Sequence, residues 1–222
     1  MNKIRITIVA LLILNSTNAT ARDFIYSVSS AKTNYTQKAV VSDVADSRNT
    51  SIACTDTETG EVHSIILDEN NYTLCWHMTK GKGYTLDVEK RDKQLIVQST
   101  KGSKSVSVIR QVDNNPFFAS FDFGVSGFYQ SGKETMNFWT LNPDNLKAYK
   151  MTLTRMEKET ITYGNTTGEA QKIRISAAGV PASFFSMFFW VRTTDGVCVR
   201  SEGQMGGPGS KKFIKELLDI QQ

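Results

Sequence analysis

The sequence has few of the residue types that most often carry enzyme chemistry. Its 222 residues include only two histidines and three cysteines. It contains no Gly-X-Ser-X-Gly nucleophile elbow and neither a CxxC nor a HExxH metal-binding pattern. The segment Gly124-Val-Ser-Gly127 is one residue short of such an elbow, and Gly206–Lys211 lacks P-loop spacing. These absences argue against an enzyme and give no reason to expect a cofactor.

The sequence also lacks a strong charge of one sign, with 26 basic and 22 acidic residues. Binding to nucleic-acid phosphates needs a concentrated basic face. The nearest candidates alternate with acids around turns, which is typical of a solvated sheet rim. They are Lys80, Lys82, Lys90, Arg91, Lys93, Lys101 and Lys104. We therefore expect no nucleic-acid partner.

No apolar run is long enough to be a stable transmembrane anchor. At the N-terminus, Lys3 and Arg5 precede the apolar run 6–14, and a polar stretch ends in Ala19-Thr-Ala21. This order is typical of a secretory signal peptide of bacterial type. We expect residues 1–21 to be a signal peptide and residues 22–222 to form a single β domain that is exported, with the periplasm as its destination.

An odd number of cysteines leaves at least one thiol unpaired in an oxidising compartment. If Cys54 and Cys75 lie on the first and third strands of a meander, their backbones are about 10 Å apart. A disulfide needs Cα atoms within roughly 7 Å. We therefore expect no bridge between these two residues.

Short β-prone runs separated by turn signals fill most of the chain. Many short strands joined by hairpins predict a mainly β, antiparallel fold. The Asp195-Gly196 pair between two such runs is a strong hairpin signal. The predicted strands are 24–30, 39–44, 51–55, 62–67, 72–78, 84–89, 94–99, 105–111, 135–141, 147–155, 159–163, 170–177, 188–193, 197–201 and 213–218.

Alternation within these runs predicts that one face of the sheet is buried. In the run from Tyr84, the residues Tyr84, Leu86 and Val88 point one way, while the polar residues between them point the other way. A sheet of this many strands tends to curl. We predict a single curved antiparallel meander, a half-barrel or partly open barrel with at most one short helix.

One segment departs from the β pattern. Asn115 is a suitable helix cap, and Pro116 suits the first helical position. Apolar residues then follow at helical spacing and predict a short helix that plugs one side of the sheet. They are Phe117, Phe118, Phe121, Val125 and Phe128.

Large aromatic residues are frequent in the second half of the chain, most densely between Phe184 and Trp190. Such rings usually fill a core, but on a concave sheet face they can also hold an acyl chain or another hydrophobic molecule. This hypothesis requires a cavity that side chains do not fill. The candidate ligand-binding residues are Phe117, Phe121, Phe138, Trp139, Phe185, Phe188 and Trp190.

The two histidines suggest a metal site if they face each other. When Leu67 pairs with Thr73 in a regular hairpin, His63 lies opposite His77, with Cys75 beside it on the same face. Two imidazoles and a thiol suit a soft divalent metal ion. A shift of one residue in the register would abolish this arrangement. The alternative is that all three are ordinary exposed or hydrogen-bonded sheet residues.

The C-terminal part of the chain resembles a known family. The motifs are 136–144, Lys150, 159–164, 188–196, 199–203 and 207–209. They are similar to exported bacterial β proteins of the domain-of-unknown-function 3108 type. This resemblance implies a curved half-barrel related in shape to periplasmic lipoprotein carriers, and it implies no catalytic residues. Cys198 stands where an apolar strand residue is usual.

The sequence therefore favours a non-enzymatic periplasmic protein that binds a hydrophobic or lipid-like envelope molecule on the concave face of a curved sheet, or that contacts an envelope protein partner. One alternative is a metal-dependent or hydrolytic enzyme that uses His63, Cys75 and His77. Another is a structural or assembly factor of the envelope with a filled core.

Overall fold

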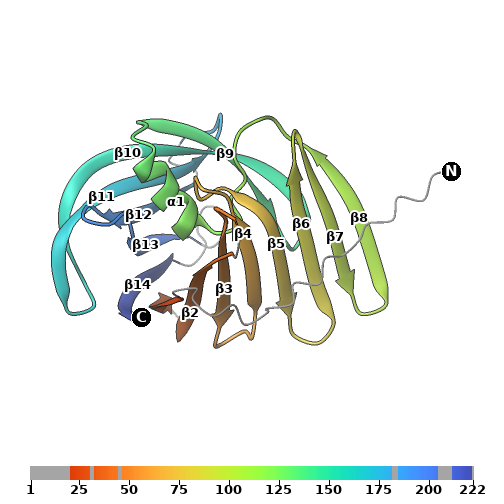
Figure 1. Ribbon diagram of the computed structural model, residues 1–222, viewed down its shortest axis with the longest axis horizontal. Coiled ribbons are helices and arrows are strands. Elements are labelled where there is room, and N and C mark those ends of the chain that lie inside the picture. The colour runs from red at the N-terminus through yellow and green to blue at the C-terminus, as the bar shows by residue number, and fades with distance from the viewer. Residues whose placement is uncertain (1–20, 31–32, 45–46, 182–184, 205–211, 222) are drawn as a thin grey trace.

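The computed structural model describes residues 21–30, 33–44, 47–181, 185–204 and 212–221. The expected signal peptide lies almost wholly outside these residues, as do Phe184 and the segment Gly206–Lys211. The described residues form one 14-stranded antiparallel sheet and the helix α1 (Figure 1), which confirms the predicted fold class. The elements are β1 (Arg22–Ser30), β2 (Asn34–Asp43), β3 (Thr50–Asp56), β4 (Val62–Leu67), β5 (Thr73–Lys80), β6 (Tyr84–Arg91), β7 (Gln94–Lys101), β8 (Lys104–Gln111), α1 (Phe121–Gln130), β9 (Thr135–Asn142), β10 (Lys147–Tyr163), β11 (Thr166–Ala177), β12 (Ser186–Arg192), β13 (Cys198–Gln204) and β14 (Lys212–Gln221).

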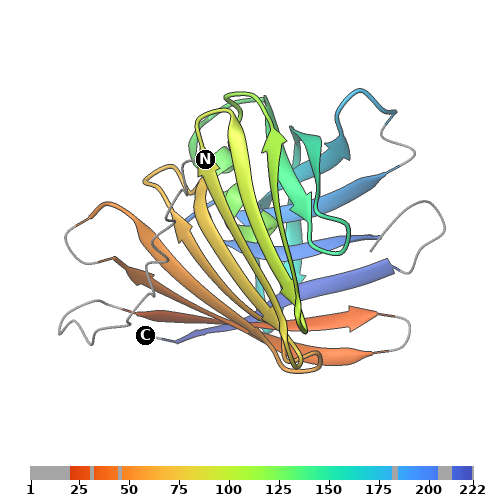
Figure 2. The same cartoon turned by 90° about the vertical axis from the view of Figure 1, so that its right-hand side faces the viewer.

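The sheet consists of two meanders that meet at the ends of the chain. Strands β1 to β8 follow one another in space, as do β9 to β14, and β1 pairs with β14 in the middle of the sheet. The edge strands are β8 and β9, so the sheet curls without closing. Figure 2 shows the strong twist between the two runs. Helix α1 connects the two edges and lies between the runs (Figure 1).

The alternating pattern of the first run is confirmed. Leu86 and Val88 on β6 are buried, while Asp87 between them is exposed. Side chains also hold the two ends of the sheet together. The Arg110 guanidinium on β8 donates to the Leu146 carbonyl at 2.7 Å, in the turn between β9 and β10. The curvature therefore brings the edges into contact without strand pairing.

The second run contains one strand where two were predicted. The runs 147–155 and 159–163 belong to the single strand β10, with an irregularity between Arg155 and Lys158 in its pairing with β11. The predicted hairpin at Asp195-Gly196 joins β12 to β13, and Gly196 has a φ of 75°, which favours glycine. The Asp-Gly pair therefore marked a true end of a strand, whereas the charged residues Glu157 and Lys158 within β10 did not.

Helix α1 begins five residues later than predicted, because the segment before it is extended and pairs with β9. The Trp139 amide donates to the Pro116 carbonyl at 2.7 Å, and the Phe118 amide donates to the Trp139 carbonyl at 2.8 Å. The N-cap is Ser120, not Asn115. No helix in the described part of the chain is long and apolar enough to cross a membrane.

Candidate functional site

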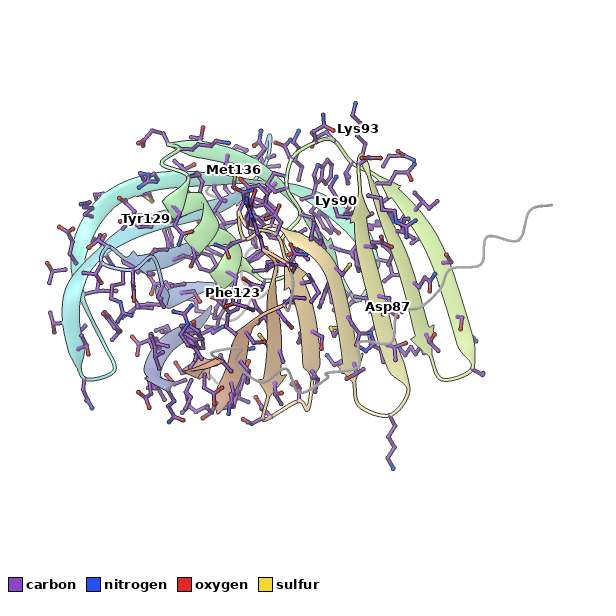
Figure 3. The ribbon with its side chains drawn as sticks, viewed as in Figure 1. Asp87, Lys90, Lys93, Phe123, Tyr129 and Met136 are labelled. Atoms are coloured by element: carbon purple, nitrogen blue, oxygen red, sulfur yellow. The ribbon has the colours of Figure 1, made fainter. Side chains whose placement is uncertain are left out.

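A cavity of about 210 Å³ lies between the first turn of α1 and the concave face of the central strands. Strands from both runs contribute to it, because β1 and β14 are neighbours. Its lining residues are Val28, Tyr35, Gln37, Ala39, Cys54, His63, Ile65, Ala119, Ser120, Phe121, Asp122, Phe123, Met187, Phe189, Ser201, Phe213 and Lys215. Figure 3 labels Phe123 and Tyr129 near the two ends of α1, and the cavity is at the Phe123 end.

The floor of the cavity includes one row of residues in register across five strands. Tyr35 on β2 pairs with Val28 on β1, which pairs with Lys215 on β14. Lys215 pairs in turn with Ser201 on β13, and Ser201 pairs with Phe189 on β12. Side chains of such opposed residues are about 5 Å apart. The row therefore places a cation and a hydroxyl group side by side between apolar side chains.

The roof of the cavity carries the partner of that cation. The Lys215 ammonium forms an ion pair with Asp122, in the first turn of α1, and it lies 4.2 Å from the centre of the Tyr26 ring. Only 12% of the Lys215 side chain and 14% of the Asp122 side chain are exposed. A carboxylate in a first turn also interacts favourably with the helix dipole. This buried pair ties α1 to the sheet across the cavity.

Two buried thiols lie close to this ion pair. Burial raises the pKa of the Cys54 thiol, which lines the cavity, to about 12. Burial, followed by the negative charge of Asp122, raises the pKa of Cys198 well above its usual value. The thiolate is the reactive form of cysteine, so burial disfavours the reactive form of both groups. All three cysteines, including the exposed Cys75, are free thiols.

His63 lines the cavity, and its hydrogen bond to Trp76 determines which ring nitrogen carries the proton. Its Nδ1 accepts a hydrogen bond of 3.1 Å from the Trp76 indole, which leaves the proton of the neutral ring on Nε2. That nitrogen is 3.6 Å from a Glu61 carboxylate oxygen. Burial lowers the pKa of His63 below its usual value. The ring is therefore neutral at neutral pH and acts as a hydrogen-bonded wall residue.

The predicted pairing of His63 with His77 is wrong. Leu67 does pair with Thr73, but an irregularity between Ile66 and Leu67 shifts the rest of the hairpin, so that Ser64 faces His77. A shift of one residue moves a side chain to the other face of the sheet. His63 consequently lies on the concave face.

His77 and Cys75 point to the convex face and are exposed, and His77 pairs with Asp87 at 2.7 Å. Figure 3 labels Asp87 on β6. Within the described residues, no group of three or more His, Cys, Asp or Glu side chains could hold a metal ion. The structure therefore does not bring the three predicted metal ligands together.

Of the predicted ligand-binding aromatics, only Phe121 lines the central cavity. Phe117, Phe138 and Trp190 are 0%, 0% and 4% exposed and fill the core. The half-buried Trp139 donates its indole hydrogen to Asp113 at 2.7 Å.

The two remaining predicted aromatics, Phe185 and Phe188, line a second cavity, of about 480 Å³, beside β12, β13 and β14. Its lining residues adjoin, in the chain, the segments 182–184 and 205–211, which are outside the described residues.

The polar residues of the cavity were missed at the level of sequence. Asp122, Ser201 and Lys215 are far apart in the chain and match no motif. One signal was available: Lys215 occupies an inward position between the buried Phe213 and Leu217, where alternation predicts an apolar residue. A charged residue at a core position points to a partner inside the fold.

Comparisons with known proteins support the fold. No protein-family model and no curated protein sequence matches the chain. A solved structure described as a beta-barrel-like protein of domain of unknown function DUF1849, from Brucella abortus, is similar with a TM-score of 0.56 and 10% identity, over 90% of this chain and 97% of that one. The hypothetical lipoprotein YmcC from Escherichia coli K12 gives a TM-score of 0.38 and 8% identity, over 89% and 86% of the two chains.

These findings correct the family expected from the sequence. The motifs after Thr135 suggested a protein of the 3108 type, but no family model matches, and a solved structure of similar fold is described as a DUF1849 protein. The turns and aromatic pairs in those motifs are features that many curved sheets share, so they did not identify a family. The chain is similar in fold to the DUF1849 beta-barrel-like protein.

Proposed function

We propose that this protein is an exported, non-enzymatic envelope protein that binds a small hydrophobic or lipid-like molecule between α1 and the concave face of its sheet. The observation that supports this function is the cavity of about 210 Å³ beneath the first turn of α1. Farther along the same helix, Val125 and Phe128 are 0% exposed. The helix therefore packs tightly there, yet it leaves room beneath its first turn.

The size of the cavity limits the ligand. At roughly 30 Å³ per water molecule, the space corresponds to about seven non-hydrogen atoms. Pockets for drug-sized ligands are larger, about 300–1,000 Å³. The ligand we propose is therefore a short amphiphile or the end of one acyl chain rather than a two-chain lipid.

Export is the second part of the proposal, and it is supported by the N-terminal sequence. Lys3, Arg5 and the apolar run 6–14 have the order of a signal peptide. Fusing residues 1–21 to a reporter enzyme that is active only after export should give activity, and replacing Leu11 and Leu12 by Arg should abolish it. A reporter that stays inactive with the unchanged leader would contradict export.

A series of straight-chain alcohols tests ligand binding. Titration calorimetry with 1-butanol to 1-decanol should show saturable one-to-one binding. The affinity should rise about fourfold for each added methylene, because each buried CH₂ contributes about 0.8 kcal/mol. It should level off once the chain outgrows the cavity.

The matched variants for this titration are Ala39→Leu and Ala53→Leu. Ala39 on β2 is 2% exposed and lines the cavity, whereas Ala53 on β3 is partly exposed and does not. The first substitution should abolish binding and the second should preserve it. Absence of saturable binding by the unchanged protein, or equal binding by both variants, would refute the proposed function.

A further inference from the structure

The charged groups of the cavity already have partners. Lys215 and Asp122 neutralise each other, and the Tyr26 ring covers one side of the ammonium. His63, the other titratable ring at the wall, accepts the indole hydrogen of Trp76. A charged ligand group would therefore meet a charge of its own sign or would have to displace an existing partner.

The Tyr35 hydroxyl at the cavity is hydrogen-bonded to Asp56. Three other neutral polar residues of the cavity, in contrast, form no such bond to a residue that the structure describes. Ser120 is the N-cap of α1, yet its hydroxyl forms no capping hydrogen bond. Ser201 is 2% exposed, lines the cavity, and has no hydrogen bond from its hydroxyl to any residue that the structure describes. The Gln37 amide also lines the cavity without such a bond. Among the described residues, only the Nε atoms of Arg174 and Arg200 are fully buried without a partner, so the Ser201 hydroxyl is accessible from the cavity and can bond to an occupant.

The position of Ser201 also gives the ligand a direction. In the register row, Ser201 stands between Lys215 and Phe189. Beside Ser201 the wall is apolar, with Phe189 opposite it on β12 and with Met187 and Phe213 two residues farther along β12 and β14. Phe121 lies against this wall, with its ring centre 6.2 Å from that of Phe189. A polar head at Ser201 would therefore leave its apolar chain against this wall.

We infer that the cavity selects single-chain amphiphiles with a neutral hydroxyl head group over those with a charged head. The head group exchanges hydrogen bonds with Ser201, and the chain lies against Met187, Phe189 and Phe213. This inference rests on the proposed function, because it specifies the ligand of the same cavity.

Three probes with the same chain and different heads test this inference at neutral pH: 1-hexanol, hexanoate and hexylammonium. In the titration with the full mature chain, 1-hexanol should bind about tenfold or more tightly than either ion, because burying an unpaired charge is costly. Ser201→Ala should weaken 1-hexanol binding about fivefold, the value of one net hydrogen bond. The matched control is Ser176→Ala on β11, which is 8% exposed and does not line the cavity; it should leave binding unchanged.

Removing the charge of Asp122 gives a second test, because it should change which head group binds. A purely structural role of the Asp122–Lys215 pair would not predict that change. Asp122→Asn keeps the shape of the side chain and leaves Lys215 without its partner, so hexanoate should now bind about tenfold more tightly than to the unchanged protein. If 1-hexanol and its homologues do not bind at all, the proposed function fails. If all three probes bind equally, or Ser201→Ala changes nothing, only the selection of a neutral head group is overturned.

Discussion

The two ends of α1 pack differently: the C-terminal end lies against the turn between β4 and β5, and the first turn lies over the concave face of the sheet. Near its C-terminal end, a Cβ added at Gly127 would lie 2.3 Å from the Asn70 carbonyl oxygen, so no space remains. At its first turn, the helix covers a cavity of about 210 Å³. This cavity opens to solvent and has polar as well as apolar lining, so it can admit water or a ligand. The open end is therefore suited to an occupant.

The largest effect is expected where the open end is tied together. Asp122→Asn should destabilise the protein by about 3 kcal/mol, because it leaves the buried Lys215 charge unpaired. Denaturant unfolding measures this loss. The double variant Asp122→Leu, Lys215→Met should recover most of the stability. A single variant as stable as the unchanged protein would show that the pair does not hold the helix.

At the filled end, Gly127→Ala should cost about 2 kcal/mol through overpacking, because the contacting atom is backbone and cannot rotate away. Gly168→Ala on β11 is the control, since its Cβ would meet only the Tyr163 hydroxyl, at 3.7 Å. Thermal unfolding distinguishes the two, with a shift of about 4–8 °C expected for Gly127→Ala. Equal effects of the two substitutions would mean that this end is not tightly filled.

At the wall of the cavity, stability should depend on pH through His63. Burial lowers its pKa in the folded protein, so the unfolded chain binds more protons just below about pH 6.5. The contribution of the neutral ring is therefore complete above that pH and is lost as the pH falls toward the lowered pKa. Unfolding midpoints measured between about pH 7.5 and about pH 5 should fall less for His63→Gln than for the unchanged protein. His77→Gln, on the convex face, should keep the dependence, and identical profiles for both variants would contradict this explanation.

The smallest effect is expected from filling the cavity itself. Ala39→Val adds two methyl groups at the open end and should change stability by less than about 1 kcal/mol, in either direction. Ala170→Val, at a core position that is 0% exposed and does not line the cavity, should cost about 1–3 kcal/mol. If a denaturant titration gives the same loss of stability for both substitutions, the region around Ala39 is packed as tightly as the core around Ala170, and the comparison is wrong.

Local patterns in the sequence were enough to predict most of the fold. Alternation at Leu86 and Val88 and the turn at Asp195-Gly196 depend on neighbouring residues, so strands and hairpins could be read directly. The start of α1 could not, because Pro116–Phe118 pairs with Trp139, which is distant in the chain. Tertiary hydrogen bonds there overrode the local helix signal.

The candidate site was mostly beyond the reach of local patterns. Lys215 and Ser201 meet Val28 and Tyr35 only because the first strand pairs with the last, and no short motif encodes that pairing. The irregularity after Ile66, which separates His63 from His77, likewise has no clear sequence signal. The sequence showed that aromatic residues are frequent, but it could not show which of them fill the core and which line a cavity. That difference depends on side-chain packing, which composition does not contain.

The most direct test of ligand binding is nuclear magnetic resonance of the mature chain with labelled methionine methyl groups, titrated with 1-hexanol. Met187 lines the cavity, whereas Met151, which is 5% exposed, lies in the filled core. We predict contacts between the hexanol protons and the Met187 methyl group, saturating with the calorimetric affinity, and none to Met151. Contacts that are absent at saturation, or that appear only at methionines outside the cavity, would contradict the proposal that this cavity binds the ligand.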